Sequence, residues 1–249
     1  MCRRLADATR RPGHDGDTTC ELGTDLCGHG PNIAIIPWQY RLVPVIDHLV
    51  HATPDLDATV ATFARSTGVV PEVGGSHQGL GTRNALVSLG SCYLELIGPD
   101  PDQPAPGRPR PFGIDDLDAP AFVAFAVRPG AGDTIERLAR SAADAGADPG
   151  DIVPMSRTRP DGVELRWRLT FPLPDRGPGV PFLIDWGDTP MPSDSIGPRA
   201  DLTELRIVDP DPDAVGAVVA ALGLDIDVEI GSAPILRVGI EGPDGPFPS

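Results

Sequence analysis

Two histidines and one acid stand where they could bind a metal ion or move a proton. His48 and His51 lie three residues apart in VIDHLVHA, residues 45–52, and Glu95 lies in YLELIG, residues 93–98. Both segments have the pattern of buried strands. Residues 48 and 51 of a strand point to opposite faces, so at most one of these histidines can reach a given site. A carboxylate among leucines is costly to bury unless it is paired, protonated or metal-bound. We therefore expect His48 and Glu95 to share a site and His51 to lie at the surface.

A third histidine, His77, lies in the glycine-rich stretch GGSHQGLGT, residues 74–82, which is predicted to be a loop. The pKa of an imidazole lies near neutrality, so His77 is a candidate general base or third metal ligand. A role in capping the loop is the alternative. Arg83 and Asn84 then enter an otherwise apolar strand and are candidates for contacting a substrate. The alternative for Glu95 is a structural ion pair with Arg83.

The second half of the chain supplies further polar and aromatic candidates. Arg157, Trp167, Asp185 and Trp186 fall in segments with strand-like patterns, and each is a candidate for contacting a substrate. For Asp185 the alternative is an ion pair with Arg157, Arg159 or Arg168. For the two tryptophans the alternative is a place in the core or in the wall of a cavity.

A repeated unit must position these candidates. Residues 45–98 read as a strand, a helix that ends at Gly68, and three strands, and residues 121–187 repeat this order. A third, shorter copy begins near residue 202 and has Glu204 at the position equivalent to His48. One such unit leaves open sheet edges. The repeats therefore predict an α+β fold: paired βαβββ modules form a cupped sheet around a cavity, and a partial third βαββ repeat is added.

The predicted domain boundaries follow these repeats. We expect a disordered leader over residues 1–42, because it lacks periodicity and is rich in Gly, Asp and Arg. The first module covers residues 43–98, a proline-rich linker 99–118, and the second module 119–190. The partial third repeat covers residues 200–245 and is expected to pack on the same domain.

The composition of the chain limits the classes of molecule that it is expected to bind. The chain has 249 residues and a formal net charge of -16, whereas nucleic-acid binding needs a basic face. No segment approaches the roughly 18 continuous apolar residues of a membrane span. Cys20, Cys27 and His29 do not have the spacing of a standard zinc motif. We expect a cytoplasmic protein that acts on a small molecule, with neither nucleic acid nor membrane as partner; a homodimer is compatible with this.

Several motifs resemble one known family. The segments IDHLV, ATPDLD, GGSHQGLGTRNALVSLG and CYLELIGPDP resemble the glyoxalase-like branch of the vicinal oxygen chelate superfamily, and RPDGVELRWRLTFP and PFLIDWGD resemble its second half. The resemblance implies paired modules around a U-shaped cavity. It also implies, in many members, a divalent metal held by His or Gln on a module's first strand and by Glu on its last. His48 and Glu95 match these two positions, but Val123 replaces the histidine in the second half.

The resemblance implies a small-molecule enzyme of lyase or isomerase type that acts on a substrate with vicinal oxygens. A divalent metal (Zn, Mn, Fe or Ni) would be held by His48, Glu95 and His77 in an unsymmetrical site, with His77 and Glu95 as catalytic residues. A His and Glu cavity without metal is the alternative form of this site. Two other classes remain open: a non-catalytic drug- or metabolite-binding protein of the resistance type, and an extradiol-type dioxygenase with two His and one Glu around Fe(II).

Overall fold

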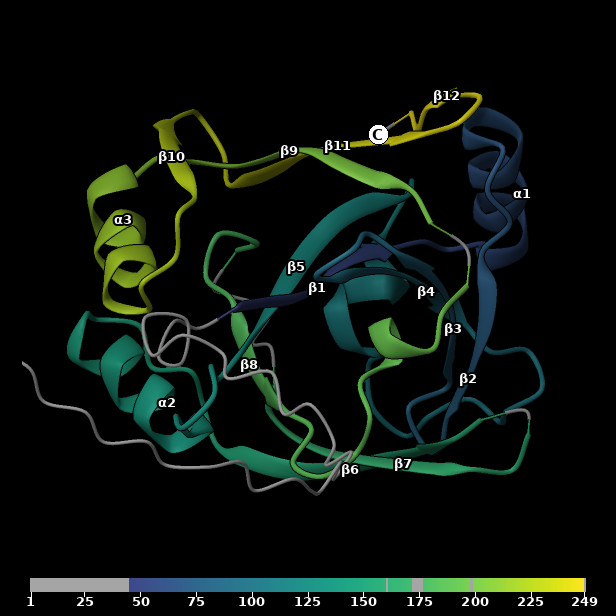
Figure 1. The fold of residues 1–249 in the computed structure, drawn as a ribbon, viewed down its shortest axis with the longest axis horizontal. Coiled ribbons are helices and arrows are strands. Elements are labelled where there is room, and N and C mark those ends of the chain that lie inside the picture. Colours follow the sequence, from purple (N-terminus) through teal and green to yellow (C-terminus); the bar gives the residue numbers. More distant parts are fainter. Residues whose placement is uncertain (1–44, 160, 172–176, 198, 249) are drawn as a thin grey trace, which may run out of the picture. The chain divides into compact units, whose positions relative to one another are not determined.

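The computed structural model describes residues 45–159, 161–171, 177–197 and 199–248. The predicted leader, residues 1–42, lies outside these ranges. The described chain is a mixed α+β fold in which strands predominate, as the sequence predicts (Figure 1). None of its helices combines the length and the apolar character that crossing a membrane requires.

Eight strands form a closed barrel in the order β1-β4-β3-β2-β6-β7-β8-β5. The first βαβββ unit supplies β1 to β4 and the second supplies β5 to β8. The strands are β1 (Val45–Ala52), β2 (Glu72–His77), β3 (Thr82–Ser88), β4 (Tyr93–Pro99), β5 (Ala121–Arg128), β6 (Ile152–Thr158), β7 (Glu164–Thr170) and β8 (Phe182–Asp185).

The two units meet along two seams. At one seam β1 pairs antiparallel with β5 over most of its length, and at the other β2 meets β6 through the pair Ser76 and Thr158. The second seam closes the predicted cupped sheet into a barrel. A barrel of about eight strands has an interior that side chains fill or that holds one small ligand.

Helices α1 (Leu56–Thr67) and α2 (Ile135–Asp144) follow the first strand of each unit. The carboxylate of Asp55 caps the start of α1 by accepting a hydrogen bond from the backbone N–H of Ala58. Gly68 ends the helix in the left-handed conformation, at φ 73°, which the sequence predicts from its position. Thr134 caps α2 in the same way as Asp55 caps α1.

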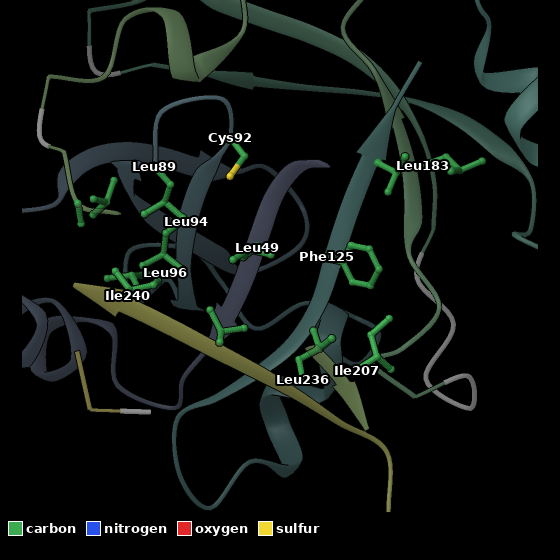
Figure 2. Close-up of a cluster of buried hydrophobic side chains, with 14 of the residues drawn as sticks. Leu49, Leu89, Cys92, Leu94, Leu96, Phe125, Leu183, Ile207, Leu236 and Ile240 are labelled. Carbon is green, nitrogen blue, oxygen red and sulfur yellow. The ribbon is translucent and has the colours of Figure 1, made fainter. Parts of the chain in front are cut away.

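The third repeat forms a separate sheet against the outside of the barrel. Its elements are β9 (Asp201–Asp209), α3 (Pro212–Ala221), β10 (Asp227–Ile230), β11 (Ile235–Gly242) and β12 (Gly245–Pro246), with strand order β10-β9-β11-β12. Figure 2 shows how its apolar side chains meet those of the barrel. The core there includes Leu236 and Ile240 from β11 together with Leu49 and Phe125 from the first barrel seam. This layer buries the outer face of β1 and β5.

The alternation of each strand separates this outer core from a second, inner core. The inward residues of β1 include Val50 and Ala52, which join a cluster with Trp167, Phe182 and Trp186 inside the barrel. Polar residues on the inward side of the same strands must therefore either be paired or line a cavity.

Candidate active site

The barrel interior contains a cavity of about 70 Å³. Its polar side chains lie on β1 to β4, with the addition of Arg157 from β6. Its apolar and aromatic side chains come mostly from β6 to β8 and from the segment before β5. The lining residues are His48, His77, Leu80, Asn84, Leu86, Tyr93, Glu95, Ile97, Pro111, Phe112, Met155, Arg157, Trp167, Leu169, Phe171, Phe182, Ile184 and Trp186.

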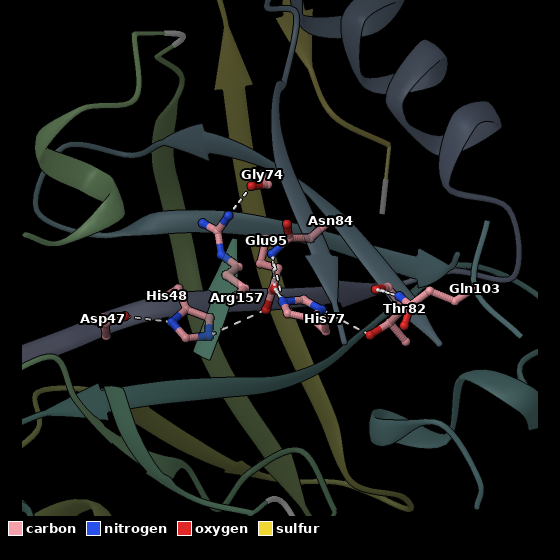
Figure 3. A network of polar contacts seen from close by, with 9 residues as sticks. All are labelled: Asp47, His48, Gly74, His77, Thr82, Asn84, Glu95, Gln103 and Arg157. Atoms are coloured by element: carbon pink, nitrogen blue, oxygen red, sulfur yellow. Dashed lines mark hydrogen bonds and ion pairs between the residues drawn. The ribbon is translucent and has the colours of Figure 1, made fainter. Parts of the chain in front are cut away.

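Glu95 is at the centre of the polar groups (Figure 3). Its Oε2 lies 3.7 Å from Nε2 of His48, and its Oε1 lies 3.8 Å from Nε2 of His77. The side-chain amide of Asn84 donates to Oε1 at 2.5 Å. All four side chains are buried. One carboxylate therefore lies between two imidazole rings, and His48 and Glu95 do face the same cavity.

A bulge in β1 places a second carboxylate behind His48. The pairing of β1 with β5 shifts between Ile46 and His48, so Asp47 is the extra residue. Bulges turn a side chain away from its regular direction, and they are frequent beside active sites. The Asp47 carboxylate accepts from Nδ1 of His48 at 2.7 Å and from Nε1 of Trp186 at 3.1 Å, and it lies 3.4 Å from Nε of Arg128.

These contacts determine which nitrogen of His48 carries a proton. Because the Asp47 carboxylate can only accept, Nδ1 of His48 is the protonated nitrogen and Nε2 faces Glu95. The ring is held from the side as well, since it stacks on Tyr93 with ring centroids 4.7 Å apart. The imidazole thus has one fixed orientation in the cavity.

His77 is fixed by a different set of contacts. Its Nδ1 lies 3.0 Å from the Thr82 hydroxyl and its Nε2 lies 3.4 Å from the amide nitrogen of Asn84. Because that nitrogen is a donor, we assign the ring proton to Nδ1 and a lone pair to Nε2. His77 is the last residue of β2, so Gly74 and the residues up to His77 are strand, where a loop was predicted. A side chain at Gly74 would collide with the Asn84 amide, which explains a glycine within this strand.

Burial shifts the pKa values of three cavity groups. It lowers the pKa of His77, and the nearby Glu95 only partly opposes this, so His77 is neutral near pH 7. Burial, together with the charges of Asp47 and Glu95, raises the pKa of Tyr93 well above its usual value, which keeps its hydroxyl protonated. Burial also lowers the pKa of Arg157.

The donor atoms suit a divalent cation, but their arrangement does not. Two imidazoles and a carboxylate are ligands that Zn, Mn, Fe and Ni accept. Among the residues that the structure describes, however, no three His, Cys, Asp or Glu side chains are arranged to hold a metal ion. Glu95 separates the two rings, and one of its oxygens is bound by Asn84. As placed, His48, Glu95 and His77 form a cluster of buried titratable groups, in which the imidazole nitrogens lie 3.7 and 3.8 Å from the carboxylate oxygens, beyond hydrogen-bond distance.

The direction of each side chain along its strand decides which of the other predicted site residues line the cavity. Asn84, Arg157, Trp167 and Trp186 line the cavity. Arg83 and Asp185 do not, because each is one position out of phase with the inward residues of its strand. Arg83 forms an ion pair with Asp57 at 2.8 Å, and Asp185 forms one with Arg168 at 2.5 Å. Arg83 and Asp185, which the sequence offers as candidates for contacting a substrate, thus lie outside the cavity, and Glu95 is not paired with Arg83.

His51 points away from the cavity, as its position in the strand predicts, but it is not at the surface. It is 2% exposed and lies between the rings of Phe122 and Phe247, whose centroids are 4.7 and 5.1 Å away. The outer layer covers this face of β1, so the expected surface position is wrong. Glu204 is exposed on β9, 3.6 Å from Arg206, and it does not line the cavity.

Sequence reasoning missed Asp47, Tyr93, Phe112 and Phe182. Tyr93 could have been found from the same alternation that identified Glu95, two residues later on β4. Asp47 could not, because a regular strand would turn it to the opposite face from His48. Phe112 lies in the predicted linker, in a 3₁₀ helix over Pro111–Asp116, and its backbone has φ 62°.

Comparisons with known proteins bear on the family. The family model described as a glyoxalase-like domain matches residues 46–223. A search of curated proteins finds no match. Among solved structures, a hypothetical protein from Staphylococcus aureus matches with a TM-score of 0.56 at 14% identity, covering 78% of this chain and 88% of that chain.

Two epimerases match more weakly. Methylmalonyl-CoA epimerase from Mycobacterium tuberculosis has a TM-score of 0.36 at 16% identity, over 56% of this chain and 84% of that chain. The Streptomyces coelicolor enzyme, in complex with 2-nitronate-propionyl-CoA, has a TM-score of 0.39 at 21% identity, over 57% and 96%. The family match spans most of the barrel and confirms the resemblance noted in the sequence. The chain belongs to the family of glyoxalase-like domains.

Proposed function

We propose that this protein is a small-molecule enzyme of lyase or isomerase type, in which Glu95, His48 and His77 move a proton on a bound substrate with adjacent oxygen atoms. The observation that carries the proposal is the pair of distances at Glu95. One buried carboxylate has an imidazole nitrogen 3.7 Å from one oxygen and another 3.8 Å from the other. Such a cluster contains both a base and groups that can return the proton.

The chemistry begins with the assignment of protons. Neutral His77 offers an unprotonated Nε2, and Glu95 offers a carboxylate, so both are candidates for removing a proton from a carbon next to a carbonyl. The protonated Tyr93 hydroxyl lines the same cavity and is a candidate donor to a developing oxyanion. The Asp47 carboxylate accepts a hydrogen bond from His48 and so orients its ring, as a third group orients the base in a catalytic triad.

Proton transfer is tested without knowledge of the natural substrate. Hydroxyacetone and 2-oxobutanoate carry adjacent oxygens and an acidic C–H, and their hydrogen–deuterium exchange in D₂O is followed by ¹H NMR. We expect the wild-type protein to accelerate exchange in at least one of them. Glu95→Gln and His77→Asn should each reduce that rate by about 100-fold or more, which is the usual share of general acid–base catalysis.

Glu72→Gln is the matched control, because Glu72 is exposed and does not line the cavity. It should leave the exchange rate unchanged. Equal rates for the wild type and Glu95→Gln with both compounds would contradict the enzyme proposal. If ligands still raised the melting temperature in that case, the non-catalytic drug- or metabolite-binding function would replace it.

A divalent cation is the second candidate for the same cavity. The Nε2 atoms of both imidazoles face the Glu95 carboxylate at 3.7 and 3.8 Å, and imidazole nitrogens and carboxylate oxygens are ligands of divalent cations. Binding would require the rings to turn onto one side of the carboxylate. Calorimetric titration with Zn, Mn and Ni tests this: His48→Ala should abolish binding, His77→Ala should weaken it, and His51→Ala should leave it unchanged. Heat of binding that persists in His48→Ala would place the cation elsewhere.

The extradiol-type dioxygenase depends on the same three side chains around Fe(II). It predicts oxygen uptake with catechol after Fe(II) is added, measured with an oxygen electrode. Uptake that is absent in wild type, or equal in wild type and His48→Ala, would remove it.

A further inference from the structure

Arg157 is a buried cation that lacks an anionic partner. The residue is 5% exposed and lines the cavity. Its guanidinium donates to the backbone carbonyl of Gly74, a neutral acceptor (Figure 3). No carboxylate of the described residues lies within 4.0 Å of it. The Glu95 carboxylate acts on it only through the electrostatic field across the cavity.

Such an arrangement is unusual for arginine. Charged side chains are rarely buried unless they are paired, because removing the charge from water is costly. Even arginines beside the barrel that are partly exposed have carboxylate partners: Arg83 pairs with Asp57, Arg128 with Asp47, and Arg168 with Asp185 and Glu136. Glu95 does not pair with Arg157 in this structure: it accepts from Asn84 and lies between the two histidines.

The remaining walls of the cavity are apolar. Trp167 and Trp186 pack together with ring centroids 5.2 Å apart, and Phe112 and Phe182 are in contact at 5.9 Å. All four rings line the cavity. A ligand that enters this space must present an apolar or aromatic body to these rings, and a body as large as a benzene ring requires the rings to move apart, since the cavity has about 70 Å³. It must also present an acceptor to the guanidinium.

We propose that Arg157 anchors the carboxylate of an organic acid whose aromatic or otherwise apolar body lies against the tryptophan and phenylalanine rings. The planar guanidinium offers parallel N–H donors that match the two oxygens of a carboxylate. The carboxylate supplies the negative charge that the buried guanidinium lacks. This inference rests on the proposed function in that it assigns a ligand to the same cavity, but it concerns binding and requires no turnover.

Matched pairs of acids and amides test the proposal. Benzoate, phenylacetate and 3-phenylpropionate are titrated by calorimetry against their primary amides, which have nearly the same shape without the charge. We expect wild type to bind at least one acid 10-fold or more tighter than its amide, as a charge-assisted hydrogen bond implies. Arg157→Gln should remove this preference, and Arg157→Lys should retain part of it.

Arg83→Gln is the control, since Arg83 faces away from the cavity and pairs with exposed Asp57. It should keep the full preference of the wild type for the acid. Equal affinity of wild type for acid and amide, or binding of neither in all three pairs, overturns the proposal even if Arg157→Gln does not fold. A preference that survives in folded Arg157→Gln overturns it too.

The two proposals fail separately. A preference for acids without any hydrogen–deuterium exchange supports the carboxylate site and contradicts the enzyme. Exchange without a preference for acids supports the enzyme and contradicts the carboxylate site.

Discussion

Replacing Asp47 with asparagine isolates the contribution of one buried charge. Asp47 is 2% exposed, and its two oxygens accept from His48 and Trp186 and attract Arg128. Asparagine has nearly the same shape but only one acceptor oxygen. If that oxygen faces Trp186, the new NH₂ group faces Nδ1 of His48, and the imidazole must move its proton to Nε2.

The loss of stability expected for Asp47→Asn follows from the contacts of Asp47 with His48, Trp186 and Arg128. A hydrogen bond to a charged group contributes about 1.5–3 kcal/mol and one between neutral groups about 0.5–1.5 kcal/mol, so losing the charge costs about 1 kcal/mol for each partner. With two hydrogen-bonded partners and an ion pair to Arg128, Asp47→Asn should lower the free energy of unfolding by about 2–3 kcal/mol. Asp57→Asn provides the comparison, because it removes a carboxylate from an exposed pair with Arg83 and should cost at most about 1 kcal/mol.

Urea-induced unfolding followed by circular dichroism at pH 7 measures both variants. ¹⁵N NMR of the histidine rings then reports the proton of His48, which should lie on Nδ1 in wild type and on Nε2 in Asp47→Asn. A loss of stability below about 1 kcal/mol for Asp47→Asn, or a His48 proton that stays on Nδ1, would refute the conclusion that the bulged Asp47 orients His48.

Other features lead to three further predictions. Gly68→Ala should lower the free energy of unfolding in urea by about 1–2 kcal/mol, because the φ of Gly68 is +73° and the new methyl group would meet Asp244. Gly216→Ala in α3 is the control: its methyl group meets nothing, and it should raise the free energy of unfolding by about 0.5–1 kcal/mol. Equal effects of the two substitutions would contradict this prediction. Burial lowers the pKa of His51 from 6.5 to about 4, so the unfolded chain takes up the proton first and stability falls as the pH drops from 6.5 toward 4. Between pH 7 and 4.5, the free energy of unfolding of His51→Leu should therefore fall by about 2–3 kcal/mol less than that of wild type. Parallel curves of stability against pH would contradict this prediction. Burial raises the pKa of Cys92 from 9.0 to about 11, so less of this thiol is ionised at pH 8. Its alkylation by iodoacetamide, followed by peptide mass spectrometry, should be roughly 100-fold slower than that of an unperturbed thiol. A rate near that of a free thiol would show that the site opens.

Much of this protein could be read from local patterns. The limits of α1 follow from the capping residue Asp55 and from Gly68, and the alternation of β1 and β4 places His48 and Glu95 on one face. These signals are short-range, because caps act within a turn and side-chain direction alternates with each residue of a strand. The repeat of strand, helix and three strands then predicts the α+β fold.

Other parts depended on which strands pair and in what register. Asp47 reaches His48 only because β1 is bulged against β5, a strand more than 70 residues away in the chain. Arg157 enters the cavity because β6 meets β2 at Ser76, which also closes the barrel. His51 is buried because the third repeat lies outside β1. Each of these contacts joins residues far apart in sequence, and its existence depends on closure of the whole sheet. A local pattern specifies which way a side chain points along its own strand, but the tertiary structure alone decides what it meets there.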